Sequence, residues 1–153
     1  MEGIIIHKLL QGDSIPWDLL LLADPSKERV ESYIHLGEFF LATVNSLVLG
    51  VYVLVKKSNV MEIINIAVRE EYQSKGIGKA LLLHAIACAK KAKVKSIEVG
   101  TGNTSIHQLA FYQKHGFRII GIEKGYFVKN YKEKIMENGE QCKDMIRLAY
   151  NVF

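Results

Sequence analysis

A glycine-containing turn between an apolar strand and an amphipathic helix is the segment best suited to bind an anion. Residues 68–82 read VREEYQSKGIGKALL, which places Gln73, Gly76 and Gly78 on the connection. The first amides of a helix have no partner within the helix, and the aligned peptide dipoles add partial positive charge there. Glycine lets a ligand approach the backbone and permits turn angles that point successive amides at one group of oxygens. The turn is therefore predicted to bind phosphate.

Two common phosphate-binding motifs do not fit this turn. A Walker A loop needs a glycine where this chain has Gln73, and a Ser or Thr where it has Ala80. A dinucleotide-binding fingerprint needs a third glycine where this chain has Leu81, although Glu98 lies about 20 residues beyond Gly78, as that motif requires. A nucleotide-dependent oxidoreductase is thus a weak alternative.

The composition is that of one ordinary globular domain spanning residues 1–153. Apolar residues make up 49% of the chain and charged residues 24%, and the formal net charge is +4. This mild charge favours an anionic cofactor, but no basic tail or basic-aromatic segment indicates a nucleic-acid surface. The longest aliphatic run, residues 19–23, is too short to cross a bilayer and no leader opens the chain, so we expect a cytoplasmic protein without membrane partners.

The cysteines form neither a disulfide pattern nor a metal-binding motif. Cys88 and Cys142 lie far apart in the chain, which is typical of reduced core thiols. His84 and Cys88 have the spacing of one helix face, but no third ligand lies nearby in the sequence. We therefore expect no bound metal.

The periodicity of apolar residues predicts a mixed α/β (α+β) domain with one sheet. Strands are expected at residues 3–9, 38–43, 47–55, 61–68, 95–101, 117–123 and 144–152. Helices are expected at residues 14–23, between Pro25 and Gly37, and at residues 77–91 and 104–115. Asn45 and Ser46 mark a hairpin turn, so the second to fourth strands form an antiparallel meander. The later strands are joined by helices, and two strands on either side of such a crossover are parallel. A doubly wound fold would instead alternate strand and helix from the start of the chain.

The order of these elements resembles the GNAT N-acetyltransferase fold over essentially the whole chain. The residues that match the family's Gln/Arg-x-x-Gly-x-Gly/Ala loop and its Tyr-x-x-x-Gly-Phe signature are Gln73, Gly76, Gly78, Tyr112, Gly116 and Phe117. Asn103, just after the strand that ends at Thr101, is a third matching feature. The resemblance implies a mixed, mostly antiparallel central sheet of about seven strands flanked by about four helices.

The resemblance also implies acetyl-CoA as co-substrate, without a metal. In that family the pyrophosphate lies on the amides of the glycine turn, and the pantetheine arm pairs with the strand before it. The cofactor-binding residues implied here are Ile66, Ala67, Val68, Gln73, Ser74, Lys75, Gly76, Ile77, Gly78, Lys79, Asn103 and Tyr112. An extended arm with amides can add to a sheet edge as a peptide would, so the strands at residues 61–68 and 95–101 must diverge.

Acetylation of an amine needs a base, an oxyanion donor and an acid. Only the unprotonated amine is nucleophilic, and a lysine-like amine has a pKa of about 10. The resemblance implies Glu62 as the base, through water, the Val68 amide as donor to the thioester oxygen, and Tyr112 as the acid that protonates sulfur. The alternatives are a solvated carboxylate at Glu62, a structural tyrosine at Tyr112, and a capping role for Asn103.

The direction of the side chains bears on both catalytic candidates. Strict alternation along the strand places Glu62 on the same face as Ile66 and Val68, a relation that a β-bulge would change. Tyr112 lies about 120 degrees from the apolar stripe of its helix, so it need not be buried. That stripe comprises Ile106, Ala110 and Gln113.

The acceptor site is expected between the helices of residues 14–35 and the aromatic, charged loop of residues 125–143. Candidate walls are Trp17, Tyr33, Tyr126, Phe127 and Tyr131, and candidate acidic residues are Glu28, Glu31, Glu133 and Glu137. The leading hypothesis is an N-acetyltransferase, a monomer or homodimer, that transfers the acetyl group to a primary amine of a small molecule or protein by direct attack in a ternary complex. The alternative is a non-catalytic acyl-CoA-binding regulatory module.

Overall fold

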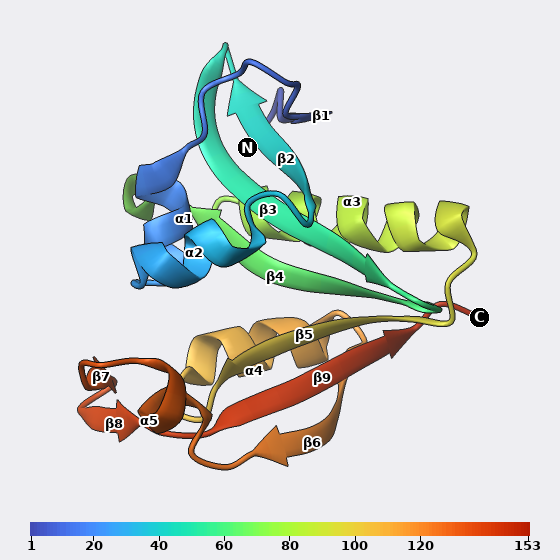
Figure 1. The fold of residues 1–153 in the computed structure, drawn as a ribbon. Coiled ribbons are helices and arrows are strands. Elements are labelled where there is room, and N and C mark those ends of the chain that lie inside the picture. The colour runs from blue at the N-terminus through green and yellow to red at the C-terminus, as the bar shows by residue number, and fades with distance from the viewer.

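A seven-stranded sheet runs through the computed structural model, which describes residues 1–153 (Figure 1). Its strands are β1 (Ile5–Lys8), β2 (Glu38–Val44), β3 (Leu47–Lys57), β4 (Val60–Val68), β5 (Ser96–Gly102), β6 (Arg118–Glu123) and β9 (Met145–Asn151). The helices are α1 (Trp17–Ala23), α2 (Lys27–Tyr33), α3 (Ile77–Ala92), α4 (Ile106–Lys114) and α5 (Tyr126–Asn130). A separate hairpin comprises β7 (Ile135–Glu137) and β8 (Glu140–Cys142), and a 3-10 turn covers Glu70–Tyr72.

The strand order is β1-β2-β3-β4-β5-β9-β6, and every neighbouring pair is antiparallel except β4 and β5. The predicted mixed, mostly antiparallel sheet of seven strands is confirmed. Two features were not predicted: β9 inserts between β5 and β6, and the loop of residues 125–143 contains α5 and the β7–β8 hairpin. Helix α1 begins at Trp17 rather than at residue 14, because Pro16 disfavours helical geometry in the residue before it.

Helix α3 covers one face of the sheet with the apolar stripe that its periodicity predicted. Its buried residues are Ile77, Leu81, Leu82, Ala85, Ile86 and Ala89. They belong to a core cluster that also contains side chains of β2 to β5 and β9, which we call the α3 core. The opposite face is covered by α1 and α2, whose Leu19, Leu20 and Val30 are fully buried. The sheet thus separates two apolar cores.

Helix α4 buries a different side from the one predicted. Ile106, in the predicted apolar stripe, is 61% exposed, whereas Tyr112 is only 3% exposed. The Tyr112 ring packs with those of Phe111 and Phe117 at centroid distances of 5.4 and 5.7 Å. The prediction was wrong because the aromatic rings bury more apolar area than the one Ile, one Ala and one Gln of that stripe, and they therefore decide which side faces the core.

A bulge in β4 reverses the alternation of its side chains. One extra residue, Ile64, interrupts the pairing of β4 with β3. After the bulge, Ile66 and Val68 pack against the α3 core, whereas Glu62, before the bulge, lies on the opposite face. Strict alternation, which placed these three side chains together, is therefore wrong for this strand.

Strands β4 and β5 pair over only part of their length. The parallel ladder ends at the pair of Ile63 and Val99. Beyond it, β5 continues beside β9 to Gly102, and β4 continues beside β3 to Val68. The two strands diverge toward their carboxyl ends, as the resemblance requires (Figure 1).

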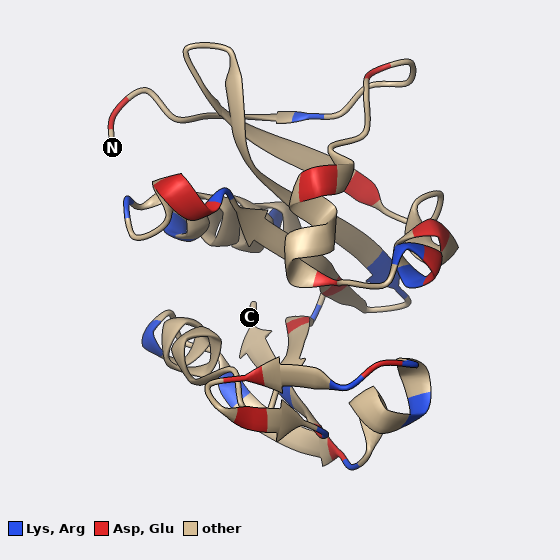
Figure 2. Ribbon diagram, turned by 90° about the vertical axis from the view of Figure 1, so that its left-hand side faces the viewer, with Lys and Arg blue, Asp and Glu red and all other residues tan.

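Charged side chains occur on both halves of the molecule, on either side of this divergence. Lys and Arg are interspersed with Asp and Glu along the ribbon (Figure 2). None of the helices combines the length and the apolar composition needed to cross a membrane.

We expect Leu81→Ala to lower the free energy of unfolding by about 3 kcal/mol, because truncating a buried leucine leaves a cavity between α3 and the sheet. Leu83→Ala is the matched control on the same helix. Its side chain is 47% exposed, so the loss should stay below about 1 kcal/mol. Urea unfolding followed by circular dichroism measures both, and equal losses would contradict the packing of α3.

Candidate active site

The turn between β4 and α3 adopts the left-handed backbone geometry that favours glycine. Ser74 and Gly76 have φ values of 60° and 90°, and Gly76 is the N-cap of α3 without a side-chain cap. A Cβ placed on Gly76 would meet no atom within 4 Å. A Cβ on Gly78 would lie 3.7 Å from the Phe111 ring and 3.9 Å from Val68. The first glycine therefore leaves the backbone open, and the second faces the space shared by α3, α4 and β4.

Successive amides of this turn are free to bind a ligand. The backbone N–H groups from Ser74 to Lys79 make no hydrogen bond within the protein, and the next amide, of Ala80, donates to the Gly76 carbonyl at 3.0 Å. The amide of Gln73 is not free, because it donates to the Glu70 carbonyl at 3.3 Å. The Gln73 side chain closes the turn through a bond from its Nε2 to the Val68 carbonyl at 3.0 Å.

The open edge of β4 presents backbone groups of Ile66 and Val68. The Arg69 N–H donates to the Leu49 carbonyl of β3 at 2.9 Å. In an antiparallel ladder, every second residue bonds to the neighbouring strand through its backbone N–H and C=O groups. Ala67 therefore bonds to β3, whereas the N–H and C=O groups of Ile66 and Val68 point away from β3. The pairing with β5 has already ended there, so an extended ligand can add to this edge. The backbone of Ala67 is not available for that pairing.

Positive charge surrounds the free amides. Lys75 and Lys79 are exposed beside them. Burial, together with the charges of Lys79 and Lys114, lowers the pKa of His115 at the end of α4. Lys79 on α3 and Lys114 on α4 thus both act on His115, and their positive charges would attract an anionic ligand.

Tyr112 is buried in the α3 core, and this burial raises its pKa above the ordinary tyrosine value. The phenol is therefore protonated at neutral pH. Its hydroxyl is bonded to no other residue. A protonated phenol with an unused donor is suited to protonate a leaving thiolate.

Asn103 fastens the segment before β9 to the end of β5. Its Oδ1 accepts hydrogen bonds from the amides of Lys143 and Asp144, both at 3.0 Å, and its own amide donates to the Asp144 carbonyl at 2.9 Å. The side-chain oxygen is thus engaged within the protein, and only the side-chain NH₂ group is left to contact a ligand.

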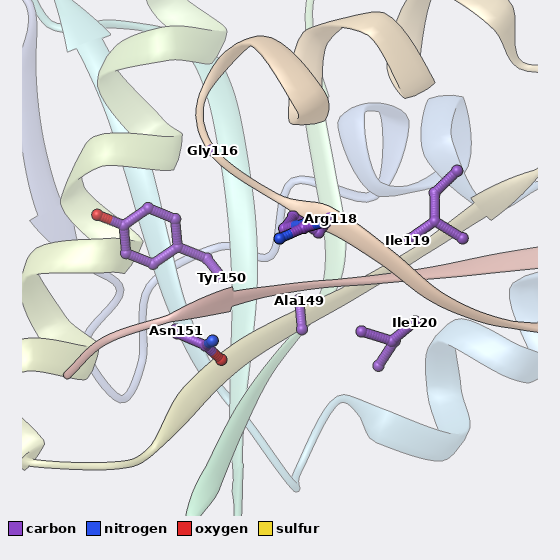
Figure 3. A pocket seen from close by; sticks show the side chains of 7 residues that line it. All are labelled: Gly116, Arg118, Ile119, Ile120, Ala149, Tyr150 and Asn151. Carbon is purple, nitrogen blue, oxygen red and sulfur yellow. The ribbon is translucent and has the colours of Figure 1, made fainter.

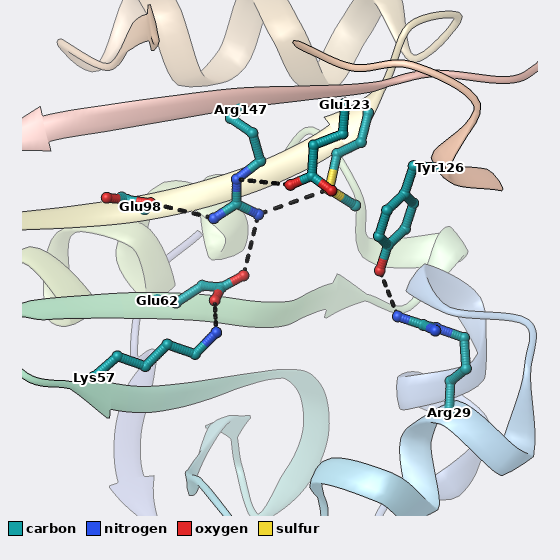
Figure 4. Close-up of polar contacts among 8 residues, drawn as sticks. Arg29, Lys57, Glu62, Glu98, Glu123, Tyr126 and Arg147 are labelled. Atoms are coloured by element: carbon teal, nitrogen blue, oxygen red, sulfur yellow. Dashed lines mark hydrogen bonds and ion pairs between the residues drawn. The ribbon is translucent and has the colours of Figure 1, made fainter. Parts of the chain in front are cut away.

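Glu62 belongs to an ion-pair network on the sheet face opposite the α3 core (Figure 4). Its Oε1 lies 2.5 Å from Lys57 Nζ, and its Oε2 lies 3.2 Å from Arg147 Nη1. Arg147 also contacts Glu98 at 3.3 Å and Glu123 at 4.0 Å. Three carboxylates against two cations make the network net negative. The Glu62 side chain is 16% exposed, so solvent reaches it.

Of the members of this network, only Glu62 was predicted from the sequence as a site residue. Glu98 and Arg147 are each the single charged residue of their strand, and a charge within an apolar strand signals a partner because an unpaired buried charge is costly. The identity of that partner depended on the position of β9 beside β5, which was not predicted.

Several predicted acceptor walls meet where α2 contacts α5 and the residue after it. Arg29 donates to the Tyr126 hydroxyl, and its guanidinium lies over the rings of Tyr126 and Tyr131. The Tyr131 hydroxyl donates to Asp24 Oδ1 at 2.9 Å, and that of Tyr33 donates to Asp24 Oδ2 at 3.4 Å. Burial raises the pKa of Tyr33 to about 12. These contacts join the two halves of the molecule beside the diverging strands.

The predicted acidic residues do not join this group. Glu28, Glu31 and Glu133 are exposed, and Glu137 accepts a hydrogen bond from Ser105 Oγ at 2.6 Å. Carboxylates gather instead in the Arg147 network.

A pocket of about 420 Å³ lies at the other end of the sheet (Figure 3). It is lined by Gly116, Arg118, Ile119, Ile120, Ala149, Tyr150 and Asn151. Asn151 pairs with Ser96 at the start of β5, so this pocket is remote from the end where β4 and β5 diverge. The structure contains no group of three or more His, Cys, Asp or Glu side chains that could hold a metal ion.

Comparison with known proteins identifies relatives over most of the chain. A family model described as the acetyltransferase (GNAT) domain matches residues 35–119. The uncharacterized N-acetyltransferase YvbK of Bacillus subtilis (strain 168) is 54% identical over 133 residues, which are 86% of this chain and 86% of that protein.

Solved structures with similar sequences have the same fold. A GNAT family acetyltransferase from Elizabethkingia anophelis with acetyl-CoA bound superimposes with a TM-score of 0.96, at 48% identity over 99% of each chain. An IAA acetyltransferase from Bacillus cereus ATCC 14579 superimposes with a TM-score of 0.92, at 50% identity over 97% of this chain and 99% of that one. With a family model over more than half of its length and these relatives over nearly all of it, the chain belongs to the GNAT family of acetyltransferases.

Proposed function

We propose that this protein is an acetyl-CoA-dependent N-acetyltransferase that acts on a primary amine of a small molecule or protein by direct attack in a ternary complex. The relative from Elizabethkingia anophelis, 48% identical over almost the whole chain, has acetyl-CoA bound, which supports acetyl-CoA as the co-substrate here. Acetyl-CoA supplies the acetyl group as a thioester, whose sulfur is a good leaving group.

One observation carries this proposal: the open edge of β4 leads directly into the turn with free amides. Ile66 and Val68 offer backbone groups that can pair with an extended arm, and the amides from Ser74 to Lys79 follow along the chain. A ligand with amides along its length and phosphates at one end matches this order of groups. Lys75 and Lys79 would pair with its charge.

We assign the catalytic roles to three groups, as the family resemblance implies. Glu62, through a water molecule, would take a proton from the acceptor ammonium, and the free amine nitrogen would then bond to the thioester carbon as the carbon–sulfur bond breaks. The Val68 N–H would donate to the thioester oxygen, where negative charge develops. The Tyr112 hydroxyl would protonate the sulfur. The acceptor nitrogen loses two protons in total as the ammonium becomes an amide. The first leaves through Glu62 before attack, and the second, lost after attack, restores the proton that Tyr112 gave to sulfur.

Thiol release from acetyl-CoA tests the proposal directly. The pure protein would be incubated with acetyl-CoA and a panel of amines, peptides and aminoglycosides, and free thiol would be followed with time. Turnover that depends on the amine is the expected result. Binding of acetyl-CoA without turnover of any amine would instead favour a non-catalytic acyl-CoA-binding module.

We expect Gly76→Val to weaken acetyl-CoA binding by about 100-fold, because the side chain would occupy the space in front of the free amides. Gly78→Val should act similarly, since its side chain would extend toward Phe111. Gly12→Val is the matched control: its φ of 92° equals that of Gly76 within a few degrees, and a Cβ there also meets no atom within 4 Å. Calorimetric titration that finds equal affinities for the Gly76 and Gly12 variants would refute the phosphate assignment.

Tyr112→Phe should lower kcat by about 100-fold and leave the Kd for acetyl-CoA unchanged, because the phenol is needed only when sulfur departs. Tyr150→Phe controls for loss of a hydroxyl near the same ring cluster, since Tyr150 packs on Phe117 at 5.6 Å. Burial raises the pKa of Tyr112, so the acid should keep its proton, and its contribution to the rate, above pH 10. A Phe variant with wild-type kcat would exclude Tyr112 as the acid.

Glu62→Gln should lower kcat/KM by about 100-fold at pH 7, and the deficit should shrink toward pH 10, where the amine loses its proton unaided. Glu98→Gln removes a carboxylate from the same arginine and should cost less than about fivefold at any pH. Steady-state kinetics between pH 7 and 10 separate the two variants. A deficit of the same size at every pH would argue for a structural role of Glu62 instead.

A further inference from the structure

Arg29 is a partly buried cation without an anionic partner. Arg69 and Arg147 each form ion pairs with carboxylates, but no carboxylate oxygen lies within ion-pair distance of the Arg29 guanidinium. Its Nε atom is buried and has no hydrogen-bond partner. Removing a charge from water without pairing it is costly, so this position calls for a missing partner.

The guanidinium of Arg29 is nevertheless held in one place. Its Cζ atom lies 5.4 Å from the ring centroid of Tyr126 and 5.2 Å from that of Tyr131. The guanidinium donates to the Tyr126 hydroxyl and, at 3.4 Å, to Asn130 Oδ1. Asp24 fixes the second ring by accepting a hydrogen bond from the Tyr131 hydroxyl at 2.9 Å. Such preorganisation lowers the entropy cost of binding a ligand at the guanidinium.

Donors remain after these contacts. A guanidinium has five N–H groups, of which the two bonds to Tyr126 and Asn130 use two. The N–H of Nε is buried, so the N–H groups left on the two Nη atoms are those that can donate to the oxygens of a carboxylate. Arg29 can therefore donate to a carboxylate and keep its present contacts.

Tyr126 connects this guanidinium with the carboxylates near the reaction site. In Figure 4 its ring lies between Arg29 and the Arg147 network, with its hydroxyl toward Arg29. Burial raises the pKa of Tyr126, the charges of Asp24, Glu123 and Glu62 raise it further, and the charge of Arg29 opposes them. The pKa of this phenol thus depends on the charge of Arg29 and on that of the proposed base, Glu62.

We propose that Arg29 binds a carboxylate of the acceptor, so that the acceptor is a small amino acid whose amine lies toward Glu62 and whose carboxylate lies on Arg29. This inference rests on the proposed acetyltransferase function and names its substrate class. The hydrogen bonds from Arg29 to Tyr126 and from Tyr131 to Asp24 join the two halves of the molecule at this point. We expect a compact zwitterion to leave these contacts intact and a polypeptide passing between the halves to break them.

Matched pairs of acceptors test the inference. Glycine, β-alanine, 4-aminobutanoate, 6-aminohexanoate and lysine would each be compared with the corresponding primary amide, which keeps the amine and removes the negative charge. For the chain length that spans the site, kcat/KM of the acid should exceed that of its amide by about 30-fold, mainly through KM. Short unstructured peptides with a free amino terminus would serve as the polypeptide comparison and should be poor acceptors.

Variants of α2 identify the residue responsible. Arg29→Gln should raise KM for the preferred acid by about 30-fold and leave KM for its amide unchanged, while Arg29→Lys should keep part of the preference. Lys27→Gln removes a positive charge from the same helix but lies over Trp17, and it should preserve the preference. The Kd for acetyl-CoA should be the same in all three variants.

The outcomes separate this inference from the proposed function. If acids and amides are acetylated equally, or if Arg29→Gln impairs both alike, the enzyme is an acetyltransferase and Arg29 is a structural contact between the halves. If peptides are the better acceptors, the substrate class is wrong. If no amine of any kind is acetylated although acetyl-CoA binds, the proposed function fails and this inference fails with it.

Discussion

The early end of the β4–β5 pairing is the constraint on which the rest of the structure depends. After Ile63 and Val99, each strand stays bonded to its other neighbour, so the ladder between them is open. Open strand edges leave backbone groups that need partners. The Gln73 side chain satisfies the Val68 carbonyl, but nothing in the fold pairs the Val68 N–H. The open edge therefore keeps a free backbone donor, which the proposed function assigns to the ligand.

The bulge at Ile64 determines the face of the sheet to which the side chains before and after it point. Because it reverses the alternation, Ile66 and Val68 share a face with Tyr112, whereas Glu62 lies on the other face with Arg147. The proposed mechanism uses both faces: Glu62 would take the proton of the amine on one face, and sulfur would depart beside Tyr112 on the other. Without the bulge, Glu62 and Val68 would share one face.

The parts of the fold that depend on local pattern could be predicted from the sequence. The buried positions of α3 followed from its 3.6-residue period, and the position of the glycine turn before α3 followed from residue types that its backbone geometry demands. Prediction failed for α4, where two neighbouring aromatic residues outweighed a weak apolar stripe. The bulge carried no signal, because Ile64 lies in a run of residues with ordinary strand propensity.

The contacts of the proposed acceptor side could not be predicted, because they join segments that lie far apart in the chain. Glu62 and Arg147 are 85 residues apart, and Arg29 and Tyr126 are 97 residues apart. Periodicity indicates the face on which a side chain lies, but not the partner that it meets there. The glycine turn is formed by consecutive residues, whereas the proposed acceptor wall requires α2, α5 and β9 to be placed together. A short motif therefore sufficed to predict acetyl-CoA as co-substrate, whereas the proposal for the acceptor needed the folded chain.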